Sequence, residues 1–367
     1  MTECSPIVRH KGRGAVTNRC GRFEPTQRTG FDDGWESGCD DSPVRTQVRR
    51  ERAKTIIARN TSPDISFDRS INPYRGCEHG CIYCFARPTH AQLGHSPGLD
   101  FETLLMAKTN GAALLEAALS KPGYKPATIA LGAVTDPYQP IERYERITRE
   151  ILEVLDRFNH PVGIVTKSAG VLRDLDILER MAERNLVKVA LSITTIDRSC
   201  ARTMEPRAST PARRLEAISA LSAAGVRTCV MVAPIIPALT DHELEAILGH
   251  AAEAGAHEAG YVMLRLPLEI ADLFNEWLQE HYPDRAKRIM GHVRDMHGGS
   301  VYRSDWFQRQ SGRGPYATLI ARRFRLACTR LGIARERAAL TTSHFAADFA
   351  AAAVSSQPDL FAVENGV

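Results

Sequence analysis

Short apolar runs alternate with amphipathic stretches along most of this chain, and this alternation constrains its fold more than any other feature. Five runs have the length of buried strands: 128–134, 162–166, 187–193, 227–233 and 260–264. The stretch 141–158 illustrates the segments between them, because Ile147, Ile151 and Leu155 recur there at helical spacing. Strands that alternate with helices predict an α/β fold with a parallel sheet.

A sixth strand is predicted to lead into Asn72, which gives six main βα strands. Pro211 and Gly225 flank the predicted helix 211–224, as residues at helix starts and ends commonly do. In such folds the loops after the carboxyl ends of the strands carry the chemistry. The residues that follow each strand are therefore the candidates for a site.

We expect four regions along the chain. Residues 1–61 are polar, rich in Arg, Asp, Gly and Ser, and are predicted to be a disordered arm. Residues 62–267 carry the βα alternation, 268–345 form a helical extension, and 346–367 are a flexible tail. The end of the arm, Arg45 to Arg59, is basic, so it either lies along phosphates or is a solvated segment.

Composition narrows the class of protein. The chain has 367 residues, of which 43% are hydrophobic, and no apolar run approaches the ~18 residues of a membrane span. Nine cysteines without a signal peptide indicate a reducing compartment, where thiols bind metals more often than they form disulfides. We therefore expect a cytoplasmic protein with no membrane partner.

Cys77, Cys81 and Cys84 lie within eight residues, in a CxxxCxxC pattern. A structural zinc ion takes four ligands, whereas three thiolates leave one iron of a four-iron cluster open. Gly76 and Gly80 allow tight turns that bring amide groups near the sulfurs. The pattern therefore favours an iron–sulfur cluster with an open iron.

Two alternatives remain for this cysteine group. His79 or His90 could complete a zinc site. The three thiols could also be unrelated.

The run from Asn72 to Phe85, with Tyr83 just before the last cysteine, resembles the radical S-adenosylmethionine (SAM) superfamily over roughly Ser62 to Phe345. The resemblance implies a partial (β/α)6 TIM-like barrel and a [4Fe-4S] cluster on Cys77, Cys81 and Cys84. It further implies reductive cleavage of SAM to a 5'-deoxyadenosyl radical. Such an enzyme needs an electron donor such as flavodoxin or ferredoxin.

Together with Thr135-Asp-Pro-Tyr-Gln-Pro, these motifs resemble the spore photoproduct lyase-related group, and more closely its branch with an arginine-rich amino terminus. That resemblance implies lyase-like chemistry on DNA, in lesion repair or modification. The lyases return hydrogen from a cysteine a few dozen residues after the cluster motif, but no cysteine occurs here between Phe85 and Ser199. The candidates to donate hydrogen in place of that cysteine are Cys200, Cys229 and Tyr138. Both cysteines could instead be residues of the buried core.

Polar residues at the strand ends are the candidates for binding SAM. In the superfamily a Gly-Gly-Glu stretch commonly binds the methionine ammonium of SAM. This chain lacks that stretch, and Asp136 is the candidate carboxylate in its place. Asp136 could instead be a turn residue. Three more candidates, which could equally be packing residues, are Lys167, Ser192 and Thr194.

The loop after the fourth strand adds Glu205, a candidate acceptor from ribose, and Arg207, a candidate clamp for a carboxylate or phosphate. The alternative is an ion pair between the two. Tyr83 is expected to contact adenine. Arg265, at the end of the last strand, is a weaker candidate for a substrate anion.

Gln357-Pro-Asp-Leu-Phe361 resembles the pentapeptide that binds the bacterial sliding clamp. Leu360 and Phe361 would fill an apolar pocket, an anchor that needs few residues. A chance match is the alternative.

The leading hypothesis is a radical SAM enzyme that acts on nucleic acid. A second is a radical SAM enzyme that acts on a small molecule or protein. A third is a non-catalytic, metal-bearing scaffold associated with the clamp.

Overall fold

A computed structural model describes residues 11–24, 44–335 and 338–346. The sliding-clamp pentapeptide at 357–361 lies outside the described residues. No helix in the described part of the chain is both long and apolar enough to cross a membrane.

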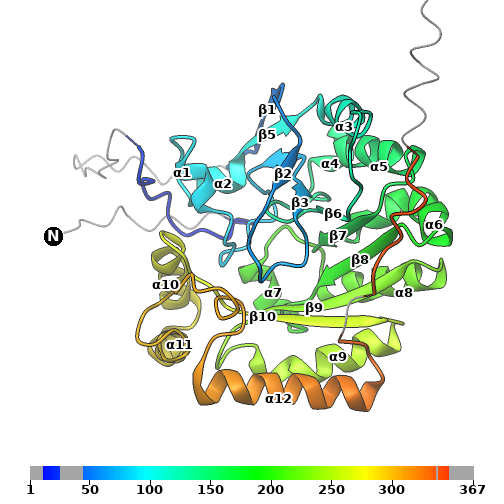
Figure 1. Ribbon diagram of the computed structural model, residues 1–367. Helices are drawn as coiled ribbons and strands as arrows, with labels where there is room; N and C mark the ends of the chain where they lie inside the picture. The colour runs from blue at the N-terminus through cyan, green and yellow to red at the C-terminus, as the bar shows by residue number, and fades with distance from the viewer. Residues whose placement is uncertain (1–10, 25–43, 336–337, 347–367) are drawn as a thin grey trace, which may run out of the picture.

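One sheet of seven strands organises the molecule, in the order β10-β9-β8-β7-β6-β3-β2 (Figure 1). Six strands run parallel: β3 (Arg69–Ile71), β6 (Ile129–Leu131), β7 (Val162–Thr166), β8 (Val187–Ser192), β9 (Arg227–Ile235) and β10 (Glu258–Met263). β2 (Ile57–Arg59) pairs antiparallel with β3 at one edge. The sheet is open between β2 and β10, so the prediction of a partial barrel with six βα strands is confirmed.

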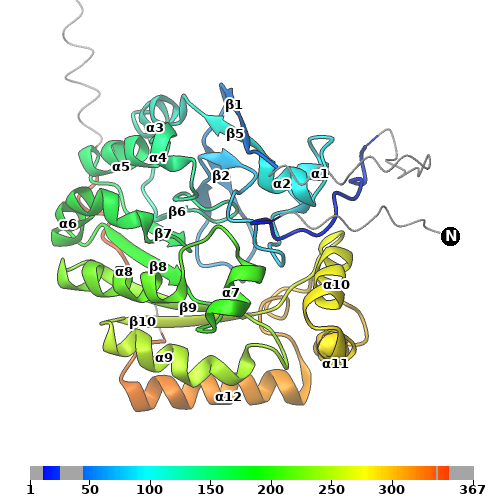
Figure 2. The same ribbon diagram turned by 180° about the vertical axis from the view of Figure 1, so that it is seen from behind.

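Helices cover the outer face of this sheet (Figure 2). They are α3 (Gly111–Leu119), α4 (Glu142–Glu145), α5 (Ile147–Arg157), α6 (Leu175–Glu183), α8 (Pro211–Ala223) and α9 (Leu244–Glu253), with α7 (Arg198–Met204) in the loop after β8. Three more helices follow β10: α10 (Ile270–His281), α11 (Pro283–Met296) and α12 (Gly314–Leu331). These three lie in the range predicted as a helical extension.

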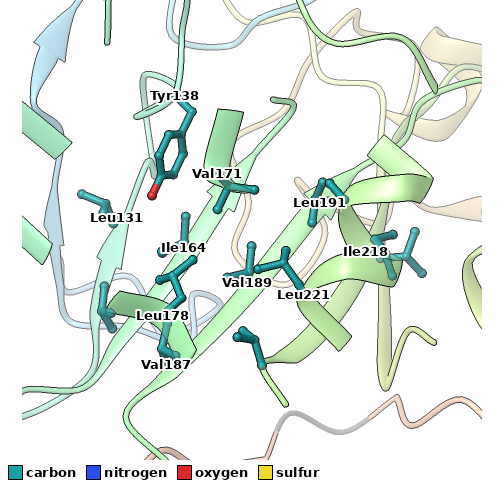
Figure 3. Close-up of a cluster of buried hydrophobic side chains, with 14 of the residues drawn as sticks. Leu131, Tyr138, Ile164, Val171, Leu178, Val187, Val189, Leu191, Ile218 and Leu221 are labelled. Carbon is teal, nitrogen blue, oxygen red and sulfur yellow. The ribbon is translucent and has the colours of Figure 1, made fainter. Parts of the chain in front are cut away.

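The two faces of the strands differ in side-chain size. On β8 the residues that face the helices are Val187, Val189 and Leu191, and each is at most 2% exposed. They pack against α6 and α8 through residues such as Leu178 and Leu221 (Figure 3). The alternate residues face the inside of the barrel and are small or polar, so the inside is not filled.

The prediction of a disordered arm over 1–61 is wrong for three segments. β1 (Gln47–Glu51) pairs in parallel with β5 (Leu104–Lys108), which also pairs with β4 (Tyr74–Arg75), and β2 joins the main sheet. Residues 13–17 are buried. Composition misled here because these segments are ordered by hydrogen bonds to Glu102 and by edge pairing, neither of which needs an apolar period.

Candidate active site

The cysteine loop follows β4 and contains two left-handed glycines, Gly76 (φ +73°) and Gly80 (φ +67°). A Cβ on Gly76 would lie 2.7 Å from Leu105 Cδ2, and one on Gly80 would lie 2.6 Å from Glu102 Oε2. The amide of Cys77 donates to the carbonyl oxygen of Phe101 at 2.9 Å. Only glycine suits these two turns, as the sequence predicted.

A buried ion pair holds this loop from behind. Arg87 donates to Glu102 at 2.5 Å and to the carbonyl oxygens of Gly80 (3.0 Å) and Cys81 (2.9 Å). Glu102 also accepts from the amides of Gly14 and Ala15 at 3.0 and 2.8 Å. Arg87 and Glu102 are both 0% exposed, so this pair fixes the loop and the amino-terminal segment together.

Cys77, Cys81 and Cys84 line one cavity of about 600 Å³. Burial is the largest cause that raises the pKa of all three thiols. Bound iron would supply the positive charge that a thiolate needs in such surroundings. Three soft sulfur donors at one cavity wall fit three corners of a [4Fe-4S] cluster.

The histidines considered as zinc ligands have other contacts. His79 Nδ1 lies 3.3 Å from Asp136 Oδ2, and His90 Nε2 lies 2.8 Å from the Leu104 carbonyl oxygen. Among the described residues, no three His, Cys, Asp or Glu side chains are grouped so that they could hold a single metal ion.

Asp136 lines the cavity beside the cysteines. It accepts from the Thr166 hydroxyl and the Lys167 amide, each at 2.7 Å, and from the Tyr138 amide at 2.9 Å. Burial acts to raise the pKa of Asp136, but His79 and these donors lower it below the ordinary value. An ionised carboxylate at this wall is suited to pair with an ammonium group.

Glu205 lies behind the cavity wall in a buried polar network. It accepts from the hydroxyls of Tyr83 and Thr194 and from the guanidinium of Arg214, and Lys167 Nζ lies 3.7 Å from it. Burial acts to raise the pKa of Glu205, but the charges of Arg214 and Lys167 lower it to about 2. Both carboxylate oxygens are therefore engaged by the protein.

The structure divides the predicted SAM-binding residues into two groups. The residues that line the cavity are Tyr83, Asp136, Lys167 and Ser192, whereas Thr194 and Glu205 do not line it. Arg207 pairs with Glu78 at 2.9 Å instead of with Glu205, so the suggested Glu205–Arg207 ion pair is wrong. The sequence could not show that Arg214, from the next helix, reaches Glu205.

Two of the residues suggested as hydrogen donors lie outside the cavity wall. The Tyr138 hydroxyl donates to Asp174 at 3.0 Å on the helix-facing side (Figure 3). Cys200 is buried in α7. Cys229 is 5% exposed and does line the cavity, from β9.

Phe85 and Arg265 form part of the cavity wall next to Cys84. The Arg265 guanidinium lies 4.6 Å from the centroid of the Phe85 ring, and Phe85 is 43% exposed. Burial is the largest cause that lowers the pKa of Arg265, and the charge of Arg309 lowers it further. Among the described residues, none forms a hydrogen bond or ion pair with the Arg265 guanidinium, so it is suited to meet an incoming anion.

A loop joins α11 to α12 (Figure 1), and its Gln310 carbonyl oxygen accepts at 2.8 Å from the amide of Met263, which lines the cavity. Arg309 binds both carboxylate oxygens of Asp64 at 2.8 and 2.6 Å, which ties the loop to the segment that contributes Ser66 and Phe67 to the cavity. In this loop Trp306 is 58% and Phe307 is 68% exposed. Exposed aromatic rings near arginines are suited to stack on planar ligands.

Sequence reasoning missed charged residues that shape the site: the half-buried Lys188 and the buried Arg87, Glu102, Arg214 and Glu258. Lys188 gave a usable signal, since a lone charge within the apolar run Val-Lys-Val-Ala-Leu indicates an inward polar position. The others lie in stretches where a charged residue is ordinarily solvated.

Residues 71–251 match the family model of the radical SAM superfamily. Uncharacterised proteins of Mycobacterium bovis and Mycobacterium tuberculosis are each 39% identical over 226 residues, which covers 61% of this chain and 66% of theirs, slightly less than two thirds. An uncharacterised protein of Methanocaldococcus jannaschii is 28% identical and covers 67% of this chain and 87% of its own.

Among solved structures, spore photoproduct lyase in complex with a dinucleoside spore photoproduct superposes with a TM-score of 0.54. The two sequences are 16% identical, and the superposition covers 77% of this chain and 79% of the lyase. At this identity the likeness concerns the fold.

Proposed function

We propose that this chain, whose residues 71–251 match the radical SAM family model, cleaves SAM reductively at a [4Fe-4S] cluster held by Cys77, Cys81 and Cys84. The observation that carries the proposal is the convergence of these thiols with Asp136 and Lys167 on one cavity at the carboxyl ends of the strands. These thiolates would hold a cluster that, once reduced by an external electron donor, would supply the one electron needed to break a carbon–sulfur bond of SAM, giving methionine and a 5'-deoxyadenosyl radical.

The polar residues of the wall bind and orient SAM in this proposal. Asp136 pairs with the methionine ammonium, because it is held ionised at the wall that carries the thiols. Ser192 and Lys167 line the cavity and donate to the methionine carboxylate or the ribose hydroxyls. The protein thus replaces the solvation that SAM loses on entry.

Tyr83, Thr194 and Glu205 act together as positioning residues. Glu205 holds the Tyr83 hydroxyl, and Lys167 Nζ lies 5.6 Å from the centroid of the Tyr83 ring, so the ring beside Cys84 has a fixed face for adenine. Glu205 was predicted to meet ribose directly, but its oxygens are bound by the protein. Arg207 binds Glu78 and so supports the cysteine loop.

We further propose that the radical acts on nucleic acid, in repair or modification of DNA. Support comes from the fold shared with a lyase whose structure holds a dinucleoside photoproduct, and from the exposed aromatic rings and arginines near the cavity. The alternative is a small-molecule or protein substrate, in which case these rings stack on another planar group.

The test is anaerobic reconstitution with iron and sulfide, followed by dithionite and SAM, with 5'-deoxyadenosine as the product measured. Cys81→Ala should abolish cluster absorbance near ~400 nm and the product. Cys328→Ala removes a buried thiol of α12 outside the cavity and is the matched control. Product formation by Cys81→Ala would refute the assignment.

The same assay tests the target. We expect damaged or modified DNA to raise the yield of 5'-deoxyadenosine, since substrate binding often triggers assembly of a catalytic site. If no DNA changes the yield and radical transfer to DNA is not detected, the nucleic-acid target is wrong while the cleavage chemistry stands.

A further inference from the structure

The cavity continues through the barrel, away from the cysteines. Inward positions on three adjacent strands hold Ala130, Gly163 and Ala190, which leave space where barrels of this kind usually carry larger side chains. The cavity reaches the amino-terminal ends of the strands, where Thr128, Lys188 and Glu258 line it. Residues 338–340 close that end.

Glu258 places one carboxylate oxygen in this deep end without a hydrogen-bond partner. Its Oε1 accepts from the Ala338 amide at 3.0 Å and from Arg227 at 3.4 Å, whereas Oε2 has no hydrogen bond. Glu258 is 1% exposed. A buried carboxylate oxygen without a donor costs free energy, so a donor from a ligand would be bound favourably there.

Lys188 lies next to this oxygen but does not hydrogen-bond to it. Its Nζ is 3.9 Å from Glu258 Oε2 and donates to the Ala338 carbonyl oxygen at 3.2 Å. The deep end of the cavity therefore presents an acceptor and a cationic donor side by side. The strands on either side of β9 fix both side chains, because Lys188 is on β8 and Glu258 begins β10.

A ligand edge with an N–H next to a C=O matches this pair. The nitrogen and oxygen of such an edge lie about 2.3 Å apart, so two roughly parallel hydrogen bonds can reach groups separated a little more widely. Four residues of β8 separate Lys188 from Ser192, or about 13 Å along the strand. The cavity is thus longer than a single six-membered ring, so a ring bound at the deep end leaves room toward the cysteine end for the group attached to it.

We propose that Glu258 and Lys188 recognise the lactam edge of a pyrimidine-type substrate. Glu258 Oε2 accepts from the ring N–H, and Lys188 donates to the adjacent carbonyl oxygen. The proposal rests on the proposed function, since it assigns this cavity to the substrate of the same site. The ring belongs either to a free nucleoside or to an unpaired base of nucleic acid, because a base within a duplex cannot reach the deep end.

The experiment measures equilibrium binding to the cluster-reconstituted protein without reductant, so that nothing turns over. The probes are SAM, thymidine, cytidine, oligothymidylate and oligocytidylate. Thymidine carries N–H where cytidine carries a bare ring nitrogen, while the neighbouring carbonyl is the same. Wild type should bind thymidine about tenfold more tightly than cytidine.

Glu258→Gln should reverse this preference, because the amide keeps an acceptor for Ala338 and turns its N–H₂ toward the ligand. Lys188→Met should weaken both pyrimidines to a similar extent. Glu216→Gln makes the same substitution at an exposed position of α8 and should match wild type. A purely structural pair would not produce the reversal.

The two sources of the ring give different results. Tighter binding of oligothymidylate than of thymidine, with the same reversal in Glu258→Gln, identifies nucleic acid, and the opposite order identifies a free nucleoside. If the wild-type protein binds SAM but no pyrimidine, or if Glu258→Gln keeps the wild-type preference, this inference alone is overturned. If the wild-type protein does not bind SAM, the proposed function is refuted as well.

Discussion

Individual buried charges decide whether the cysteine loop can hold iron. The Arg87 guanidinium is planar and donates to four carbonyl oxygens and Glu102, a set that one ammonium group cannot reproduce. Arg87→Lys should lower the free energy of unfolding of the apoprotein by about 3 kcal/mol, since it breaks a buried, fully bonded pair. Urea unfolding measures this change.

The same substitution should lower the iron bound per chain after reconstitution, because the loop loses its anchor at Gly80 and Cys81. Arg325→Lys, on the exposed face of α12, is the control and should change neither quantity. Full iron loading of Arg87→Lys would show that the cluster can organise the loop by itself.

At the same scale, His160 gives a pH dependence that is independent of the cluster. It lies between the Tyr124 hydroxyl (2.9 Å) and the Pro161 carbonyl oxygen (3.0 Å), and burial is the largest cause that lowers its pKa to about 4. In the unfolded chain the imidazole pKa is ~6.5, so the unfolded chain binds a proton at a higher pH than the folded protein does. Stability is therefore complete above about pH 6.5 and is lost toward pH 4, by about 3 kcal/mol.

Urea unfolding of the apoprotein across this pH range tests the prediction. His90, whose pKa burial also lowers to about 4, contributes in the same direction, so His160→Gln should remove about half of the pH dependence. His250→Gln, at an exposed position of α9, should leave it unchanged. An unaltered slope in His160→Gln would mean that the imidazole is charged in the folded protein.

At the scale of secondary-structure elements, much of the fold could be predicted because buried parallel strands are continuous apolar runs. Val162–Thr166 is β7 as predicted. The predicted helix 141–158 is instead two helices, since Arg146 adopts a left-handed conformation (φ +55°) that periodicity does not reveal. The thiols and Asp136 could be placed for a similar reason: each follows a strand that the pattern locates.

The two faces of β8 should respond oppositely to substitution. Leu191 is 0% exposed against the helices, so Leu191→Ala should cost about 2–5 kcal/mol of stability. Ala190 lines the cavity, so Ala190→Leu should leave the unfolding free energy unchanged or raised while weakening ligand binding in the cavity about tenfold. Urea unfolding and ligand binding, measured for both variants, test this assignment of the two faces of β8. A loss of stability in Ala190→Leu without a loss of binding would contradict it.

At the scale of the whole molecule, the contacts that complete the barrel join segments far apart in the sequence. Glu102 binds residues 14 and 15, Arg309 binds Asp64, and Glu258 binds Ala338. Each contact depends on one charged side chain, whose partner is far away in the sequence. For this reason the sequence could predict the strands and bring the three cysteines to one site, but not the segments that close the two ends of the cavity.

The tail pentapeptide raises a question at the same scale, which is whether the enzyme is brought to DNA by a partner. Gln357 to Phe361 lies outside the described residues and follows the barrel in the sequence. Leu360→Ala with Phe361→Ala should abolish pull-down of a purified bacterial sliding clamp, because the two apolar side chains are the anchors. SAM cleavage by the double variant should match wild type.

Val363→Ala, just after the motif, is the matched control and should retain clamp binding. If clamp binding survives the double substitution, the pentapeptide is a chance match. The nucleic-acid target would then depend on the cavity and on the aromatic rings beside it. If binding is lost and cleavage is kept, clamp binding and SAM cleavage are separate functions of one chain.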